Sequence, residues 1–139
     1  MPSYMADTNV YVCATNDPGF RSRFEAFVSA HGPLLVSAVV VAEVLIGVPD
    51  AANHASATHA VAAGSRILAP VDEDWLVAGA ALARLGGDAV TKGRSFWNDA
   101  LLGAQCARLG ATLVTQNAAD FRRLRRWIGV RAVPPFPSR

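Results

Sequence analysis

Long uninterrupted apolar runs are missing from this sequence of 139 residues. The densest apolar stretch, residues 34–48, contains Ser37 and Glu43 and is shorter than the roughly 20 residues that a transmembrane helix needs. The N-terminal segment MPSYMADTN has no basic leader followed by an apolar core, so no signal peptide is predicted. These absences argue against a membrane protein and predict a cytoplasmic location.

Cysteine is also scarce, and the few metal-binding residue types are badly spaced for zinc. Cys13 and Cys106 are too few and too far apart for a disulfide framework or a zinc site, so both are predicted to be reduced core thiols. His54 and His59 are five residues apart and would lie on different faces of a helix. The glycine pair at 86–87 lacks the Lys and Ser/Thr of a phosphate-binding loop. No internal repeat is apparent.

The composition that remains is that of one folded domain spanning residues 1–139. Hydrophobic residues make up 52% of the chain and the mean hydropathy is +0.25, which argues against disorder and suggests that a partner covers some apolar surface. The net charge of +2 is unevenly distributed. Acids exceed bases in residues 1–69, whereas bases exceed acids from Pro70 onward.

Short apolar runs alternate with helical patterns along the whole chain. This alternation predicts an α/β domain with a mainly parallel central sheet. Helices are predicted at residues 20–31, 38–46, 73–85, 98–110 and 121–127, with a polar loop at 88–94. Strands are predicted at residues 4–6, 34–36, 66–69, 111–115 and 130–133.

The stretch SFWNDALLGAQCARLGATLVTQNAADF carries the densest group of candidate site residues. Its predicted helix begins at Asn98 and Asp99 and ends at Gly110, a residue suited to a left-handed helix end. The following strand leads into a polar loop that contains Asp120. Open α/β sheets place their ligands where strands end and helices begin, so this stretch predicts part of a site.

Two further acids stand out by position. Asp7 falls at the junction between the first strand and the next helix, where simple capping of backbone N–H groups is an equally good explanation. Glu43 is the only charge within an apolar helix for which Ser37 is the predicted N-cap. An unpaired buried charge is costly, so Glu43 must face water, a basic partner or a cation.

Asp7, Glu43, Asp99 and Asp120 can converge at the carboxyl ends of parallel strands. Like charges about 4 Å apart repel by about 4 kcal/mol per pair at an effective dielectric constant of 20, so such a cluster takes up protons or binds a cation. Oxygen ligands without Cys or His select Mg²⁺ or Mn²⁺. The chemistry expected is metal-dependent hydrolysis of phosphodiester bonds.

Four ordered motifs carry a family resemblance. They are Asp7-Thr8-Asn9, Ser37 with Glu43, Asn98-Asp99-Ala100-Leu101 leading to Gly110, and Leu113-Val114-Thr115-Gln116-Asn117 with Asp120-Phe121. In this order the motifs resemble those of PIN-domain ribonucleases, and more specifically of VapC-type toxins from toxin–antitoxin pairs. The resemblance covers nearly the whole chain.

The resemblance implies a three-layer α/β/α fold and an endoribonuclease that uses Mg²⁺ or Mn²⁺. It implies inhibition by a VapB-like antitoxin, and it implies a homodimer. It assigns metal binding to the four acids and supporting roles to Thr115 and Asn117. Some relatives have an acid where this chain has Asn117, which leaves the number of metal ions open.

Basic and aromatic residues near the acids suggest contacts with RNA. Phe96 and Trp97 lie beside Asp99 and either could stack a base, although core packing is expected for at least one of them. Clustered arginines suit RNA phosphates, and a solvated helix face explains them equally well. These arginines are Arg122, Arg123, Arg125 and Arg126.

Two other functions remain open on sequence grounds. The first is a PIN-like RNA-binding or regulatory module without catalysis, although all four acids are present. The second is a small-molecule phosphatase, which usually needs a second acid two residues after the first, where this chain has Asn9. The sequence does not identify the RNA, because cleavage specificity depends on the shape of the groove.

Overall fold

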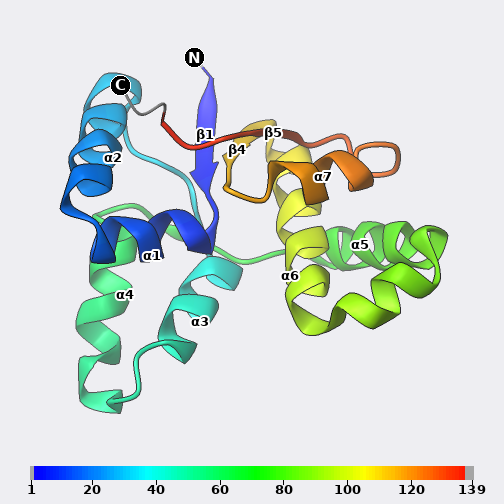
Figure 1. Cartoon of the computed structure of the whole chain (residues 1–139), viewed down its shortest axis with the longest axis horizontal. Helices are drawn as coiled ribbons and strands as arrows, with labels where there is room; N and C mark the ends of the chain where they lie inside the picture. The colour runs from blue at the N-terminus through cyan, green and yellow to red at the C-terminus, as the bar shows by residue number, and fades with distance from the viewer. Residues whose placement is uncertain (1, 137–139) are drawn as a thin grey trace.

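The computed structural model describes residues 2–136, with side chains described outside residues 87–95. Five short parallel strands form its centre. Helices lie on both sides of the strands (Figure 1). In chain order the strands are β1 (Ser3–Ala6), β2 (Val36–Ser37), β3 (Ile67–Leu68), β4 (Ala111–Val114) and β5 (Arg131–Val133). The helices are α1 (Thr8–Asn16), α2 (Pro18–His31), α3 (Ala38–Ile46), α4 (His54–Ala62), α5 (Asp72–Leu85), α6 (Gly87–Leu109) and α7 (Ala118–Leu124), with a 3-10 turn at Ala51–Asn53.

The strands pair in two groups that one bridge joins. One group has the order β1-β4-β5 and the other is β2-β3, and all pairs are parallel. A parallel bridge between Met5 and Leu35 connects the groups, and the Leu35 amide donates to the Tyr4 carbonyl at 2.9 Å. All five strands therefore end at the same edge of the sheet, as the prediction of a mainly parallel sheet requires.

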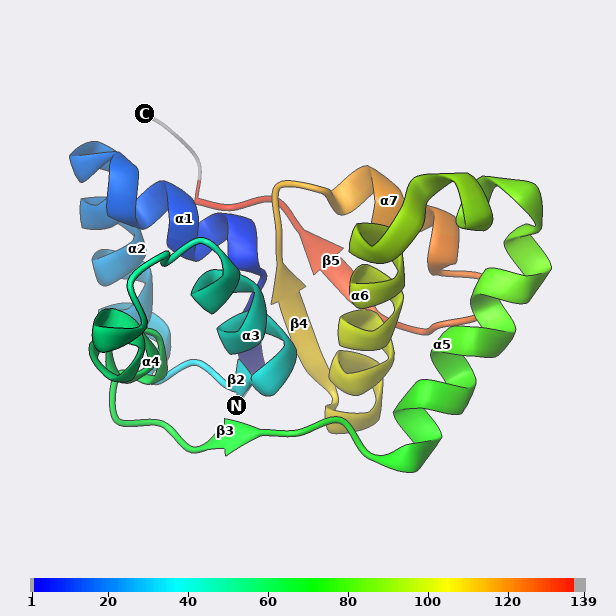
Figure 2. The ribbon, with the colours of Figure 1, turned by 90° about the horizontal axis from the view of Figure 1, so that it is seen from below.

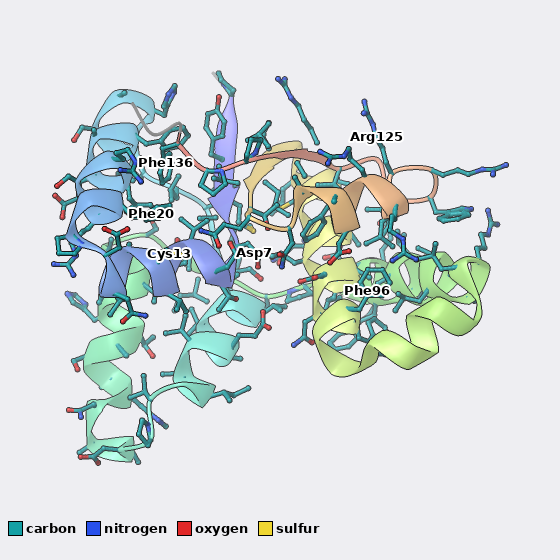
Figure 3. All side chains as sticks on the ribbon, viewed as in Figure 1. Asp7, Cys13, Phe20, Phe96, Arg125 and Phe136 are labelled. Atoms are coloured by element: carbon teal, nitrogen blue, oxygen red, sulfur yellow. The ribbon has the colours of Figure 1, made fainter. Side chains whose placement is uncertain are left out.

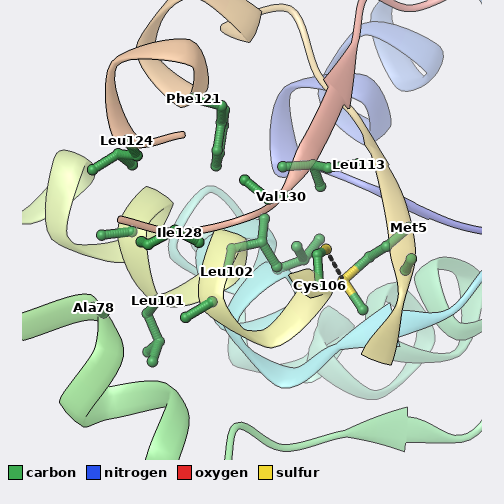
Figure 4. Packing of buried hydrophobic residues seen from close by; sticks show 14 of the residues in the cluster. Met5, Ala78, Leu101, Leu102, Cys106, Leu113, Phe121, Leu124, Ile128 and Val130 are labelled. Carbon is green, nitrogen blue, oxygen red and sulfur yellow. Dashed lines mark hydrogen bonds between the residues drawn. The ribbon is translucent and has the colours of Figure 1, made fainter. Parts of the chain in front are cut away.

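Successive residues of a strand point to opposite faces of the sheet, and each face here has its own helical layer. Met5 and Leu113 belong to a large core that includes residues of α3 to α7, as Figure 4 shows in part. Ala6 and Val114 belong to a second core, which α1 and α2 cover. The predicted three-layer α/β/α architecture is confirmed.

Local signals in the sequence explain several helix ends. Asp17 accepts from the amides of Gly19 and Phe20 and caps α2, whose first residue is proline. Ser37 caps α3 by accepting from the Val39 amide, as predicted. Gly110 ends α6 with φ of 67°, a conformation that glycine adopts at little cost.

The largest error of the sequence prediction concerns the start of α6. This helix begins at Gly87, so residues 88–94 are not a loop and Asp99 is not at a helix start. Residues 88–94 show no apolar periodicity, and for that reason the sequence predicts a loop there. A helix that is already packed along one part adds a residue at little cost, so it continues without such a pattern. Gly86 is both the C-cap of α5 and the N-cap of α6, and Figure 2 shows the two helices following each other directly.

The other boundaries differ from prediction by a few residues. The helix expected at 121–127 is α7 at Ala118–Leu124, and the second strand is Val36–Ser37 instead of 34–36. Such shifts at element ends are usual, since terminal turns and short strands depend on tertiary contacts. Among residues 2–136, no helix is long and apolar enough to cross a membrane.

Candidate active site

The ends of the two central strands bring Asp7 and Thr115 together. Ala6 of β1 is paired with Val114 of β4, so the next residue of each strand lies side by side. The Asp7 amide donates to the Val114 carbonyl at 2.9 Å, and Thr115 Oγ1 donates to Asp7 Oδ2 at 2.7 Å. Both side chains are buried. An acid is therefore held rigidly at the carboxyl edge of the sheet.

Three donors hold the Asp7 carboxylate. Oδ1 accepts from the Thr8 amide at 2.7 Å, and Oδ2 accepts from Asn9 Nδ2 at 3.2 Å in addition to the Thr115 hydroxyl. Burial raises the pKa of Asp7 above its ordinary value, while the hydrogen bonds from Thr115, Thr8 and Asn9 oppose that rise. The carboxylate is thus oriented by neutral donors and has no basic partner among them.

Glu43 reaches the same region through Thr8. Thr8 Oγ1 donates to Glu43 Oε1 at 2.9 Å, which joins the first turn of α1 to the middle of α3. Glu43 is half-buried. The sequence predicts that Glu43 faces water, a basic partner or a cation, and in the structure it is partly exposed with the neutral Thr8 hydroxyl as a partner. Thr8 therefore lies between Glu43 and Asp7 and contacts both carboxylates.

Asp99 and Asp120 come from two helices that pack on each other. Asp99 lies within α6 and is buried, whereas Asp120 lies in the first turn of α7 and is half-buried. Among the side chains that the structure describes, no three Asp, Glu, His or Cys residues form a group able to hold a metal ion as they stand. The structure therefore links Asp7 to Glu43 through Thr8, and it does not draw all four acids into one group.

The donor chemistry nevertheless fits a hard divalent cation. The four predicted acids offer carboxylate oxygens, and the hydroxyls of Thr8 and Thr115 contact two of those carboxylates directly. Carboxylate oxygens without thiolate or imidazole ligands are the ligands that Mg²⁺ and Mn²⁺ prefer.

Asn9 and Gln116 are site residues that the sequence prediction missed. Asn9 Nδ2 lies 3.3 Å from Thr115 Oγ1, and Asn9 Oδ1 accepts from the Gln116 amide at 3.2 Å. Gln116 Nε2 in turn lies 3.0 Å from the sulfur of Cys13. Asn9 and Gln116 both belong to the motifs quoted for the family resemblance, but the resemblance assigned no role to either.

The two predicted supporting residues act in different ways. Thr115 contacts Asp7 directly through its hydroxyl. Asn117 contributes through its backbone, because its amide donates to Thr115 Oγ1 at 3.0 Å while its exposed side chain makes no capping bond to α7.

The aromatic residues beside Asp99 divide as expected between core and surface. Phe96 is buried in the large core, and the Arg123 guanidinium lies over its ring at 5.7 Å. Trp97 is exposed, and its ring meets that of Trp75 edge to face at 5.7 Å. Of Phe96 and Trp97, Trp97 is therefore the one with an accessible ring.

The four arginines are not equivalent either. Arg122, Arg125 and Arg126 are exposed, and Arg123 is half-buried. Figure 3 shows Arg125 on the far side of α7 from Asp7. The donors that hold Asp7 are Thr8, Asn9 and Thr115, so none of the four arginines belongs to that network.

With this geometry in place, comparison with known proteins identifies the family. The sequence model of the PIN-domain family matches residues 4–126, which is most of the chain. The chain belongs to the PIN-domain family. Comparison with curated protein sequences gives no significant match.

Three solved structures share the fold of this PIN domain. VapBC2 from Rickettsia felis bound to a promoter DNA fragment has a TM-score of 0.69 at 21% identity, covering 94% of this chain and 97% of that one. DNA-bound VapBC from Salmonella typhimurium has a TM-score of 0.69 at 20% identity, covering 96% and 98%. FitAB bound to the IR36 DNA fragment has a TM-score of 0.62 at 20% identity, covering 98% and 97%.

Proposed function

We propose that this PIN domain is a metal-dependent endoribonuclease of the VapC type, held inactive by a VapB-like antitoxin. The observation that carries the proposal is the Asp7 network. A buried carboxylate at the carboxyl edge of a parallel sheet is oriented by Thr115 and linked through Thr8 to Glu43. Hydrogen bonds to neighbouring residues fix a carboxylate in the way that metal-ligating side chains are usually fixed.

In this proposal Asp7, Glu43, Asp99 and Asp120 hold Mg²⁺ or Mn²⁺. The bound metal would lower the pKa of water and stabilise the charge that builds on a phosphate under attack. Thr115 and Asn9 keep the Asp7 carboxylate at a fixed angle, and the Thr8 hydroxyl does the same for Glu43. The acids carry the ligand oxygens, and these neutral residues limit their movement.

The proposed substrate is RNA, with contacts to phosphates supplied by the exposed residues Arg122, Arg125 and Arg126. A cytoplasmic location is part of the proposal, because the RNA and a VapB-like antitoxin would be found there.

A wide apolar pocket supports the proposed antitoxin partner. The pocket has a volume of about 1260 Å³ and lies between α1, α2 and α4, with Val12, Phe24 and Val61 among its lining residues. Complexes named VapBC and FitAB are among the solved structures with this fold. An amphipathic antitoxin segment would bury this apolar surface.

We also propose a homodimer, which would cover exposed apolar residues on α5 and α6. Trp75 and Trp97 contact each other at the surface, and Leu76 is 74% exposed. Exposed apolar residues that gather in one place often mark an interface. Sedimentation analysis of the wild type and of Leu76→Arg tests this assignment, and a wild-type monomer would contradict it.

The alternative phosphatase function is not favoured by the contacts of Asn9. This residue stands where that class needs a second acid, and its amide group is bonded to Asp7 and to the Gln116 backbone. It therefore serves to hold the network and offers no carboxylate.

The deciding experiment incubates total cellular RNA with the purified chain, stripped of antitoxin, in Mg²⁺ or Mn²⁺. We expect discrete new RNA ends that EDTA and Asp99→Asn abolish. Asp72→Asn is the matched control, because Asp72 is an exposed acid at the start of α5 and should leave cleavage unchanged. Folded wild-type protein that binds metal but yields no new ends would favour an RNA-binding module without catalysis.

A further inference from the structure

Gln105 is a fully buried amide in α6, at a position where packing alone would favour an apolar side chain. Both ends of its amide are used. Oε1 accepts from Ser37 Oγ at 2.5 Å, and Nε2 donates to the Leu68 carbonyl at 3.0 Å. Burying these polar groups is tolerable only because each has a partner.

The two partners of Gln105 are neighbours at the end of the β2–β3 pair, where Ser37 is in register with Leu68. Ser37 is also the N-cap of α3, because its Oγ accepts from the Val39 amide at 3.1 Å. A hydroxyl has one proton and two lone pairs, so it can donate to Gln105 and accept from Val39 at the same time. The first turn of α3 is thereby bonded to the C-terminal part of α6.

The two helices so joined carry two of the proposed metal ligands at matching positions. Glu43 lies six residues after Ser37, and Asp99 lies six residues before Gln105. At a rise of about 1.5 Å per residue, each acid is about 9 Å along its helix from the bridge. Figure 2 shows α3 and α6 running in opposite directions, so both acids are displaced from the bridge in the same direction.

We infer that Gln105 is a positioning residue, whose bridge to Ser37 and Leu68 sets the separation of Glu43 on α3 from Asp99 on α6. The inference rests on the proposed function for the importance of these two acids. Gln105 does not touch the reacting groups and acts only through the helices. Residues bonded directly to a metal ligand change metal affinity about 10–100-fold when they are lost, so a residue that acts through the helices is expected to have an effect at or below the lower end of this range.

The test compares Gln105→Met with wild type in the full chain without RNA. Methionine has nearly the same shape and cannot form the bridge. Calorimetric titration with Mn²⁺ should show weaker binding in the variant, by up to about tenfold. In metal-free protein, backbone amides of α3 should exchange hydrogen faster, because their link to α6 is lost.

Arg108→Met is the matched control on the same helix. Arg108 Nε pairs with Asp74 Oδ1 at 2.9 Å, so this variant loosens α6 from α5 and leaves the contact with α3 intact. It should lower general stability without weakening Mn²⁺ binding or selectively speeding exchange in α3. If Gln105→Met does not fold, Gln105→Leu is the second variant, because Ser37→Ala would also remove the N-cap of α3 and speed exchange there for that reason alone.

The inference would be overturned if the Gln105 variants bound Mn²⁺ as tightly as the wild type and their α3 amides exchanged at the wild-type rate. The same holds if Arg108→Met produces equal effects, because the loss would then reflect stability alone. If wild-type protein fails to bind Mn²⁺, the proposed metal site fails separately, and the exchange rates of metal-free α3 still decide whether Gln105 positions that helix.

Discussion

Thr115 Oγ1 donates to Asp7 Oδ2 at 2.7 Å across 108 residues of sequence, and this bond joins the end of β4 to the start of α1. The same hydroxyl oxygen lies 3.0 Å from the Asn117 amide nitrogen and 3.3 Å from Asn9 Nδ2. One buried oxygen therefore organises the backbone and side chains on both sides of the candidate site.

Thr115→Val should destabilise the protein, because it removes the acceptor of the Asn117 amide and one of the three donors to the buried Asp7 carboxylate. The expected loss of unfolding free energy is about 1–3 kcal/mol, measured by urea denaturation. Thr112→Val is the control, since Thr112 lies on the opposite face of the same strand. Equal effects of the two variants would contradict this role for Thr115.

The raised pKa of Asp7 predicts that metal-free protein loses stability as the pH rises. The folded state holds the Asp7 proton more readily than the unfolded chain does, so stability falls from about pH 3.8 up to the folded pKa. Urea denaturation in EDTA across this range should show the fall in wild type and not in Asp7→Asn. If the unfolding free energy of the two proteins depends on pH in the same way, Asp7 is not the group responsible.

Binding of Mn²⁺ should show the opposite dependence on pH. A metal ligand must be deprotonated, so affinity should decrease as the pH falls through the raised pKa of Asp7. Because the Thr115 hydrogen bond lowers this pKa, Thr115→Val should move the decrease to higher pH. Calorimetry over a pH series measures the Mn²⁺ affinity of the wild type and of Thr115→Val. If affinity decreases over the same pH range in both proteins, the Thr115 hydrogen bond does not lower the pKa of Asp7.

Gly103→Ala should stabilise the protein by about 1 kcal/mol, because alanine favours a helix interior over glycine. A Cβ at this position would lie 3.4 Å from Phe121 Cε1 and 3.5 Å from Val130 Cγ1, which is ordinary contact. Gly79→Ala in α5 meets nothing within 4 Å and measures the helix preference alone. Thermal denaturation of both variants checks the prediction. A lower melting temperature for Gly103→Ala alone would show that an alanine methyl group does not fit against Phe121 and Val130.

Replacing Arg122, Arg125 and Arg126 by alanine should weaken binding to every RNA by a similar factor, because phosphate contacts carry no sequence information. The slope of log affinity against log salt should decrease by about 0.7 for each lost contact with single-stranded RNA. Arg66→Ala serves as the control, since Arg66 is an exposed arginine elsewhere on the chain. Fluorescence anisotropy measures both quantities, and an unchanged slope would remove the arginines from the interface.

Prediction from the sequence worked best where a local pattern decides the structure. Ser37 and the apolar run after it predicted α3 with its observed bounds, Ala38–Ile46. Gly110 predicted the end of α6, where the backbone is left-handed. In each case the capping residue and the periodicity lie within the element itself, so no distant contact was needed.

The start of α6 shows where this approach failed. Residues 88–94 have no apolar periodicity, yet they continue a helix whose later turns pack on the core. The neighbours of Gln105 were equally hidden, because Ser37 is 68 positions away and Leu68 contributes only a backbone carbonyl. Neither contact leaves a periodic signal in the sequence.

The sequence by itself determined which residues can do chemistry here and at which ends of elements they stand, because capping, strand ends and residue type are local properties. The tertiary structure alone decided that Thr115 and Asn9 hold Asp7, that Thr8 meets Glu43, and that Gln105 ties α3 to α6. Those contacts depend on strand register and on how helices pack across the sheet, which arise only when distant segments bury their apolar faces together.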